Sequence, residues 1–127
     1  MSEVRKSGKE ISGRLLDFAT EVLALSNRMG RTAAGRYLAN QLLRAACSAG
    51  ANYQESRGAE SRADFIHKMH IVLKELREAL YWLTLVDRSR LVTGESVSAL
   101  VTEADELVSI LVRALVTAKA KGTNSDI

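Results

Sequence analysis

Apolar residues recur along this chain at steps of three and four, which is the spacing of one face of an α-helix. Four segments carry the pattern, and it predicts helices over about 8–29, 33–57, 62–88 and 95–120. The predicted core positions are Ile11, Leu15, Phe18, Val22, Leu25 and Met29; Leu38, Leu42, Ala45, Ala49 and Asn52; Ile66, Met69, Leu73, Leu76, Leu80 and Leu83; and Val97, Leu100, Ala104, Leu107, Leu111 and Leu115. A second stripe beside the third set (Phe65, Val72, Ala79 and Val86) predicts contact with more than one neighbour.

Start and stop signals bound these segments. A Ser-x-x-Glu capping box begins at Ser7, and a similar start signal begins at Ser61. Gly30 is expected to end the first helix in a left-handed conformation, and Gly58 is expected to end the second. Residues 122–127 are expected to form a flexible tail.

Four long helices joined by short connections favour a left-handed up-down-up-down bundle. The chain has 127 residues, a length typical of one domain, so we expect a single unit over 1–127. Proline is absent, although average usage would supply roughly six in this length. Since proline breaks helix interiors, its absence permits uninterrupted helices.

The chain carries the features of a cytoplasmic protein. Cys47, its only cysteine, cannot form an intrachain disulfide, which fits a reducing compartment. The first residues are polar and do not resemble a signal peptide. No uncharged apolar run reaches the roughly 18 residues of a membrane span. We therefore expect no membrane partner.

Charge is distributed unevenly along the chain, which has a net charge of +3. After Glu21 come four basic residues with no acid among them, and they are candidate nucleic-acid contacts: Arg28, Arg31, Arg36 and Arg44. All charged residues between positions 95 and 112 are acidic. The pattern is compatible with a solvated surface, with a nucleic-acid face, or with head-to-tail contact between copies of the chain.

Residues 45–51 read AACSAGA, a run of small side chains that lets a partner backbone come close. Beside this run, Ser48, Asn52 and Glu55 share one helix face, and His67 or Lys68 on the next helix could bond to them. We interpret this group first as a polar network that sets helix register, and a ligand or partner site is the alternative.

Two adjacent aromatic residues, Tyr81 and Trp82, point about 100° apart on a helix. One can fill the bundle while the other contacts a neighbouring subunit. His67 and His70 follow Asp64 at helical spacing, but a di-iron bundle requires two Glu-x-x-His motifs and further glutamates. The sequence therefore predicts no metal, no cofactor and no enzyme activity.

These motifs resemble those of the bacterial four-helix-bundle family associated with intervening sequences of 23S ribosomal RNA genes. The residues that carry the resemblance are Ser48, Gly50, Asn52 and Glu55; Ser61, Asp64, Phe65, Ile66, His67 and Lys68; and Lys74, Glu75, Tyr81, Trp82 and Leu83. The resemblance implies a left-handed bundle that often assembles as a ring-shaped homopentamer. It also implies kinship with accessory proteins of diversity-generating retroelements, whose basic surfaces contact nucleic acid and a reverse transcriptase.

We therefore expect a non-enzymatic, homo-oligomeric scaffold or binding protein. Its expected partners are further copies of itself, forming a pentamer, together with RNA, DNA or a nucleic-acid-processing protein. Phe65, Tyr81 and Trp82 are the candidate subunit contacts. The alternative is a purely structural or adaptor oligomer that does not bind nucleic acid.

Overall fold

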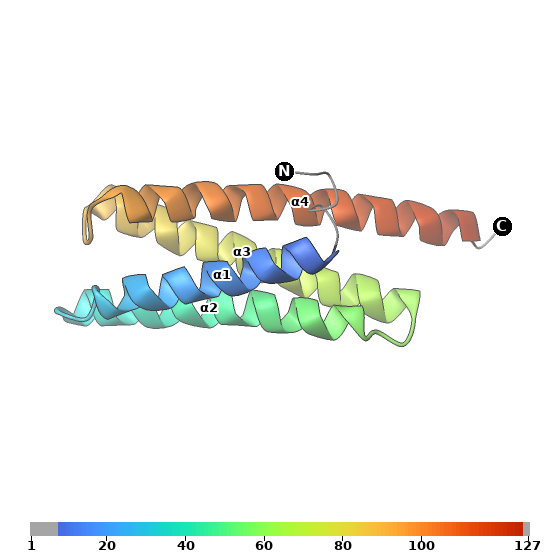
Figure 1. The fold of residues 1–127 in the computed structure, drawn as a ribbon, viewed down its shortest axis with the longest axis horizontal. Helices are drawn as coiled ribbons and strands as arrows, with labels where there is room; N and C mark the ends of the chain where they lie inside the picture. Colours follow the sequence, from blue (N-terminus) through green and yellow to red (C-terminus); the bar gives the residue numbers. More distant parts are fainter. Residues whose placement is uncertain (1–7, 126–127) are drawn as a thin grey trace.

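The computed structural model describes residues 8–125, which form four helices and no strand within that range. They are α1 (Gly8–Asn27), α2 (Ala33–Arg57), α3 (Arg62–Ser89) and α4 (Glu95–Ser125). Figure 1 shows an elongated bundle in which consecutive helices run in opposite directions. The predicted all-α four-helix fold is confirmed, while the handedness of the bundle stays a prediction.

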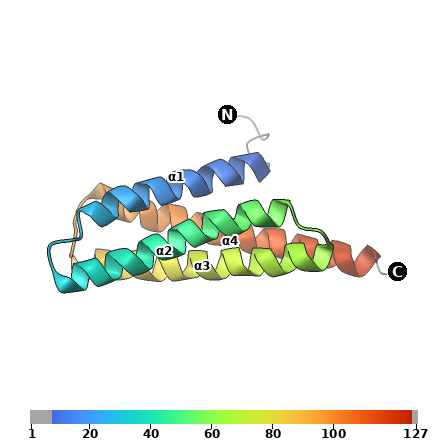
Figure 2. The same ribbon diagram turned by 90° about the horizontal axis from the view of Figure 1, so that it is seen from below.

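The helices close into a ring of neighbours. Each helix packs on the next one in the chain, and α4 returns to α1, whereas the backbones of the diagonal pairs α1/α3 and α2/α4 lie farther apart. The contact between α2 and α3 is the most extensive, and the contact between α1 and α4 is the loosest. Figures 1 and 2 together show that α4 projects beyond the connection between α2 and α3.

All predicted core positions of α1 and α4 are buried. Helix α2 differs from its prediction, because Tyr53 and Ser56 are buried while Asn52 is only half-buried. The sequence pattern could not show which face of α2 points to the core, since small residues occur on all of its faces. In α3 the second stripe is fully buried at Val72, Ala79 and Val86, whereas Phe65 in that stripe and Ile66 and Leu80 in the first are half-buried. The helix packs between α2 and α4, so both stripes contribute to the core.

Side-chain caps begin the two central helices. The hydroxyl of Thr32 accepts a hydrogen bond from the backbone N–H of Gly35, and Ser61 accepts one from the N–H of Asp64. These bonds satisfy backbone donors that lack helical partners. The predicted start at Ser7 lies outside the described residues.

The predicted left-handed stop at Gly30 is wrong. The described residues have positive φ only at Arg90, which ends α3, and at Gly94. After α1, the N–H groups of Arg28 and Met29 instead bond three residues back, and these tight turns need no left-handed residue. Helix α4 continues to Ser125, past the predicted start of a flexible tail.

Two glycines of α2 differ in the space around them. A Cβ at Gly35 would overlap the backbone carbonyl of Met29. A Cβ at Gly50 would lie 3.8 Å from the Cβ of Leu15, which is ordinary van der Waals contact. Gly35 is therefore required by the close return of α2 past the end of α1, and Gly50 is not.

This difference predicts opposite effects of two alanine substitutions. Gly35→Ala should lower the free energy of unfolding by about 1–3 kcal/mol, because backbone must move to admit the methyl group. Gly50→Ala should raise it by about 0.5–1 kcal/mol, because alanine favours the helix. Urea denaturation of both variants at one protein concentration measures the two effects. Equal midpoints would contradict the steric argument.

Candidate functional site

The polar residues of α2 and α3 form two separate contacts. The Asn52 side chain donates to the backbone oxygen of Ser48 at 2.9 Å and to its hydroxyl at 3.1 Å, within α2. Between the helices, the ammonium of Lys68 donates to Glu55 at 2.7 Å. This bond raises the pKa of Lys68. His67 is exposed and pairs with no described residue.

The polar contacts lie where α2 is joined to α3, and they are open to solvent at Glu55. Asp64 contributes through its backbone N–H, which donates to Ser61 at 3.0 Å. Gly50 faces Leu15 of α1 instead of a polar group. Only the Lys68–Glu55 pair links the two helices, near their connection, and a role of these groups in setting helix register stays a prediction.

Three of the four candidate arginines gather at the opposite end of the bundle. Arg28 donates to the hydroxyl of Ser96 at 3.1 Å and to the carbonyl of Thr93 at 3.2 Å. Arg36 donates to the carbonyl of Gly30 at 3.2 Å. Arg31 is exposed and has no partner among residues 8–125.

Arg44 does not belong to this group. It lies farther along α2, where its guanidinium pairs with Glu75 at 3.2 Å and with Glu78, both on α3. Its charge is therefore balanced within the bundle, apart from the other three candidate arginines, and its contact with nucleic acid stays a prediction.

The last turn of α3 and the connection that follows it bring two further arginines to the end that holds Arg28. We call this surface the basic end, and it comprises Arg28, Arg31, Arg36, Arg88 and Arg90, with Asp87 and Glu95 as nearby acids in the sequence. A recess of about 670 Å³ opens there between the two connections and is lined by Asn27, Arg28, Gly30, Arg31, Leu91, Val92 and Thr93. Arg88 and Arg90 escaped sequence reasoning because they lie far along the chain from the others.

Sequence reasoning also missed a clamp between α1 and α4. The guanidinium of Arg14 donates to Glu103 at 2.6 and 3.0 Å and to Glu106 at 2.9 Å. The hydrogen bond to Glu103 is the largest cause of a raised pKa at Arg14. These acids belong to the acidic segment that could have served contacts between copies, and the bundle uses them internally.

An aromatic patch lies on the face shared by α2 and α3. Tyr37, Tyr81 and Trp82 form it, with ring centroids 6.1 Å apart for Tyr37 and Trp82 and 5.1 Å apart for Tyr81 and Trp82. The indole of Trp82 donates to Glu78 at 3.1 Å. Tyr37 and Tyr81 are 57% and 62% exposed, whereas Phe65 is half-buried against the core.

An apolar groove of about 300 Å³ runs between α1 and α2, and we call it the α1–α2 groove. It is lined by Ser12, Leu15, Leu16, Ala19, Cys47, Gly50, Ala51 and Gln54. Leu16 is 68% exposed, and Leu23, two turns farther along α1, is 49% exposed. The small residues of α2 thus let α1 pack closely at Leu15, and beside this contact they leave an open groove.

Other site types have no counterpart in the described part of the chain. Residues 8–125 contain no group of three or more histidine, cysteine, aspartate or glutamate side chains placed to hold a metal ion. None of the helices α1 to α4, as far as they are described, is apolar enough over a sufficient length to cross a membrane.

A profile of the family described as 23S rRNA-intervening sequence protein matches residues 10–113. The chain belongs to this family. The matched range starts in α1 and ends in α4, so this member carries the family pattern through all four helices. The resemblance drawn from the motifs around Ser48 and Asp64 is confirmed.

A solved structure from Bacteroides thetaiotaomicron has a similar fold, with a TM-score of 0.78. It is described as a protein with unknown function from the S23 ribosomal protein family. The two chains are 31% identical, and the alignment covers 85% of this chain and 96% of the other. No curated protein matches this family member.

The α1–α4 clamp predicts a measurable coupling. Arg14→Met and Glu103→Gln should each lower the free energy of unfolding, and a double-mutant cycle should return a coupling of about 1 kcal/mol. Arg113→Met is the matched control, because Arg113 is exposed and makes no ion pair with any described residue. Chemical denaturation in low salt measures all four variants, and a coupling near zero would contradict the clamp.

Proposed function

We propose that this protein is a non-enzymatic, homo-oligomeric scaffold that binds nucleic acid, or an enzyme acting on nucleic acid, through its basic end. The observation that carries the proposal is the convergence of five arginines, in or beside two chain connections, on one end of the bundle. The family description, 23S rRNA-intervening sequence protein, favours a nucleic-acid context for this surface.

Electrostatics at the basic end suit a phosphate ligand. Arg31 and Arg90 make no side-chain bond to another described residue, so both guanidinium groups are free to donate. Arg28 is held at the wall of the recess by its bonds to Ser96 and Thr93. A guanidinium presents a planar fork of donors that matches two phosphate oxygens. The surface therefore combines Arg28, whose guanidinium is held in place, with Arg31 and Arg90, whose guanidinium groups are unpaired among the described residues.

Two different apolar surfaces support self-association. The α1–α2 groove presents Leu16, and the aromatic patch presents Tyr37 and Tyr81 on another face. When the two halves of a contact are different surfaces, copies join head to tail, and such contacts close into a ring if the rotation permits. We propose that the aromatic patch of one subunit packs in the groove of the next and that the ring is a pentamer.

In such a ring the basic end would recur once per subunit. A repeated cluster of arginines raises the apparent affinity for a long polyanion, because several weak contacts act together. The binding would weaken steeply with salt, since each neutralised phosphate releases counterions. Assembly and nucleic-acid binding would use separate surfaces and would not compete.

A purely structural oligomer is the second candidate. It is favoured by the bonds of Arg28 to Ser96 and Thr93 and of Arg36 to Gly30, because these bonds fasten the connections at the end of the bundle. In that case both arginines serve folding and need no ligand. The two candidates differ in what happens when the arginines are replaced.

The first test measures nucleic-acid binding against salt. Arg28→Gln/Arg31→Gln/Arg36→Gln should lower the affinity for RNA and DNA without loss of assembly. Arg31→Gln/Arg90→Gln avoids the bonds that fasten the connections, and it should reduce the slope of log affinity against log salt by about 1.5–2. Filter binding from 50 to 200 mM salt measures both variants. Absence of RNA and DNA retention by the folded wild type at low salt would remove the nucleic-acid proposal.

The second test concerns assembly. Sedimentation should give about 70 kDa for a closed pentamer, against 13.9 kDa for one chain. Leu16→Glu and Tyr81→Glu should each dissociate the ring, because both charges would be buried at the proposed contact. Leu16→Ala is the milder control. A wild-type protein that sediments as a monomer at micromolar concentration would refute the ring.

A further inference from the structure

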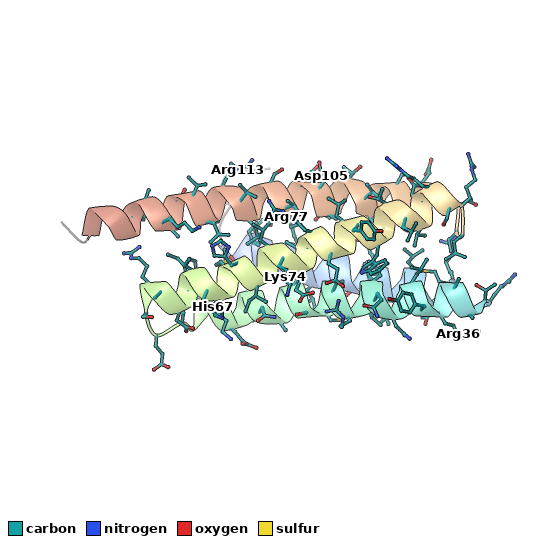
Figure 3. All side chains as sticks on the ribbon, turned by 180° about the vertical axis from the view of Figure 1, so that it is seen from behind. Arg36, His67, Lys74, Arg77, Asp105 and Arg113 are labelled. Atoms are coloured by element: carbon teal, nitrogen blue, oxygen red, sulfur yellow. The ribbon has the colours of Figure 1, made fainter. Side chains whose placement is uncertain are left out.

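The exposed face of α3 carries only basic side chains over three turns. His67, His70, Lys74 and Arg77 follow one another at steps of three, four and three, so they lie along one side of the helix, and all four are exposed. We call this set the α3 stripe. It spans about 15 Å along the helix axis. Figure 3 views the molecule with α3 in front and shows His67, Lys74 and Arg77 along it.

Two acids of α3, Glu75 and Glu78, are turned away from this face, and the half-buried Asp64 lies one turn before its first member, His67. Glu75 and Glu78 are adjacent in sequence to members of the stripe, yet both pair with Arg44 on α2. In the sequence, the mixture of acids and bases in this helix resembles an ordinary solvated surface. The fold separates these acids from the bases, since Glu75 and Glu78 point to α2 and the side chains of the stripe point to solvent.

The bases of the stripe are left without partners. Neither Lys74 nor Arg77 makes an ion pair or hydrogen bond with its side chain to any residue between 8 and 125. Arg113, on the neighbouring α4, is visible from the same side in Figure 3, as is the acid Asp105. The cationic charge of this face therefore exceeds its anionic charge.

From this arrangement we infer that the α3 stripe is a second binding surface for the phosphate backbone of a nucleic acid, in addition to the basic end. The inference rests on the proposed nucleic-acid function and extends it to a different face. Lys74 and Arg77 are assigned the phosphate contacts, and His67 and His70 extend the surface along the backbone of the ligand.

The chemistry of the stripe favours a polyanion over a protein partner. Cores of protein interfaces are depleted in lysine and rich in apolar and aromatic groups. The stripe contains no phenylalanine, tyrosine, tryptophan or aliphatic residue, and the aromatic patch begins only at Tyr81, one turn beyond Arg77. Duplex DNA carries one phosphate per roughly 1.7 Å of axis, so the cations Lys74 and Arg77, one turn apart, can each reach a phosphate whatever the sequence.

The competing partner is the acidic face of α1 on another copy. Asp17 and Glu21 are exposed there and have no partner among the described residues. Helix α1 is diagonal to α3, and the backbones of the two helices do not approach each other within one chain. A contact between copies could therefore bring these acids to the stripe, and the experiment must separate this outcome from nucleic-acid binding.

The experiment compares Lys74→Gln/Arg77→Gln with the wild type, using a 20-nucleotide single strand and the corresponding duplex. Both glutamines are exposed helix formers, so the melting temperature should stay within a few degrees. The affinity at 0.1 M salt should fall roughly 10–50-fold, and the salt slope should decrease by about 1.5–2. Comparison of the two ligands tells whether the backbone of a single strand or of a duplex is preferred.

A charge-restoring control separates a local site from net charge. Asp17→Asn/Glu21→Gln removes two acids from the diagonal helix, and adding it to Lys74→Gln/Arg77→Gln returns the chain to its original net charge. The quadruple variant should bind as weakly as the double variant if the stripe makes the contacts. Recovery of the wild-type affinity would overturn the proposed role of the stripe, because it would show that the net charge of the chain determines the affinity for nucleic acid.

The remaining outcomes distinguish the stripe from the basic end and from assembly. If Arg31→Gln/Arg90→Gln weakens binding while Lys74→Gln/Arg77→Gln does not, the stripe is refuted and the proposed function stands. If Lys74→Gln/Arg77→Gln and Asp17→Asn/Glu21→Gln both lower the sedimenting mass, the stripe is a contact between copies instead. If the wild type binds neither ligand, the proposed function and the stripe fail together.

Discussion

The packing of α2 against α3 is the interaction on which the rest of the structure depends. Ala45, Ala46 and Ala49 are fully buried, and these small side chains let α2 approach its neighbours closely. The α2–α3 contact is the most extensive in the bundle. Because a small side chain contributes little area, such a contact is stable only when the two surfaces fit closely over many turns. Helix α3 in turn packs on α4, so its position bears on the other half of the bundle.

The same packing sorts the charges of the chain. Arg44 holds Glu75 and Glu78 between α2 and α3, and Arg14 holds Glu103 and Glu106 between α1 and α4. Acids are thereby used at the borders between helices, where they meet bases of the same chain. Among the other bases, five arginines lie at the basic end, and Lys74 and Arg77 lie along one face of α3. A modest net charge of +3 thus yields strongly cationic regions.

The loosest contact, between α1 and α4, has a different character from the others. It is supplemented by the polar clamp of Arg14, and the outer side of α1 leaves Leu16 and Leu23 in solvent. A helix with apolar side chains on two sides is incompletely covered by a single bundle. This incomplete coverage gives a physical reason for assembly: a further chain would bury side chains that four helices leave exposed.

Periodicity alone specified the four helices and the cores of α1 and α4, because large aliphatic residues on one face and polar residues on the other leave a single phase. It failed in α2, where Asn52 was placed inward instead of Tyr53, since small residues on all sides carry no phase information. The stop signal at Gly30 was also misleading. The first helix ends in tight turns that need no left-handed residue.

The placement of charge was decided only in three dimensions. Arg44 and Arg36 look alike in the sequence, yet one is paired across the bundle and the other lies at the basic end with Arg88 and Arg90. Glu75 and Lys74 are neighbours in the chain and face different surroundings. Helical period tells which residues share a face, but the partner of a charge depends on which helix packs beside that face, and that follows from the fit of whole surfaces.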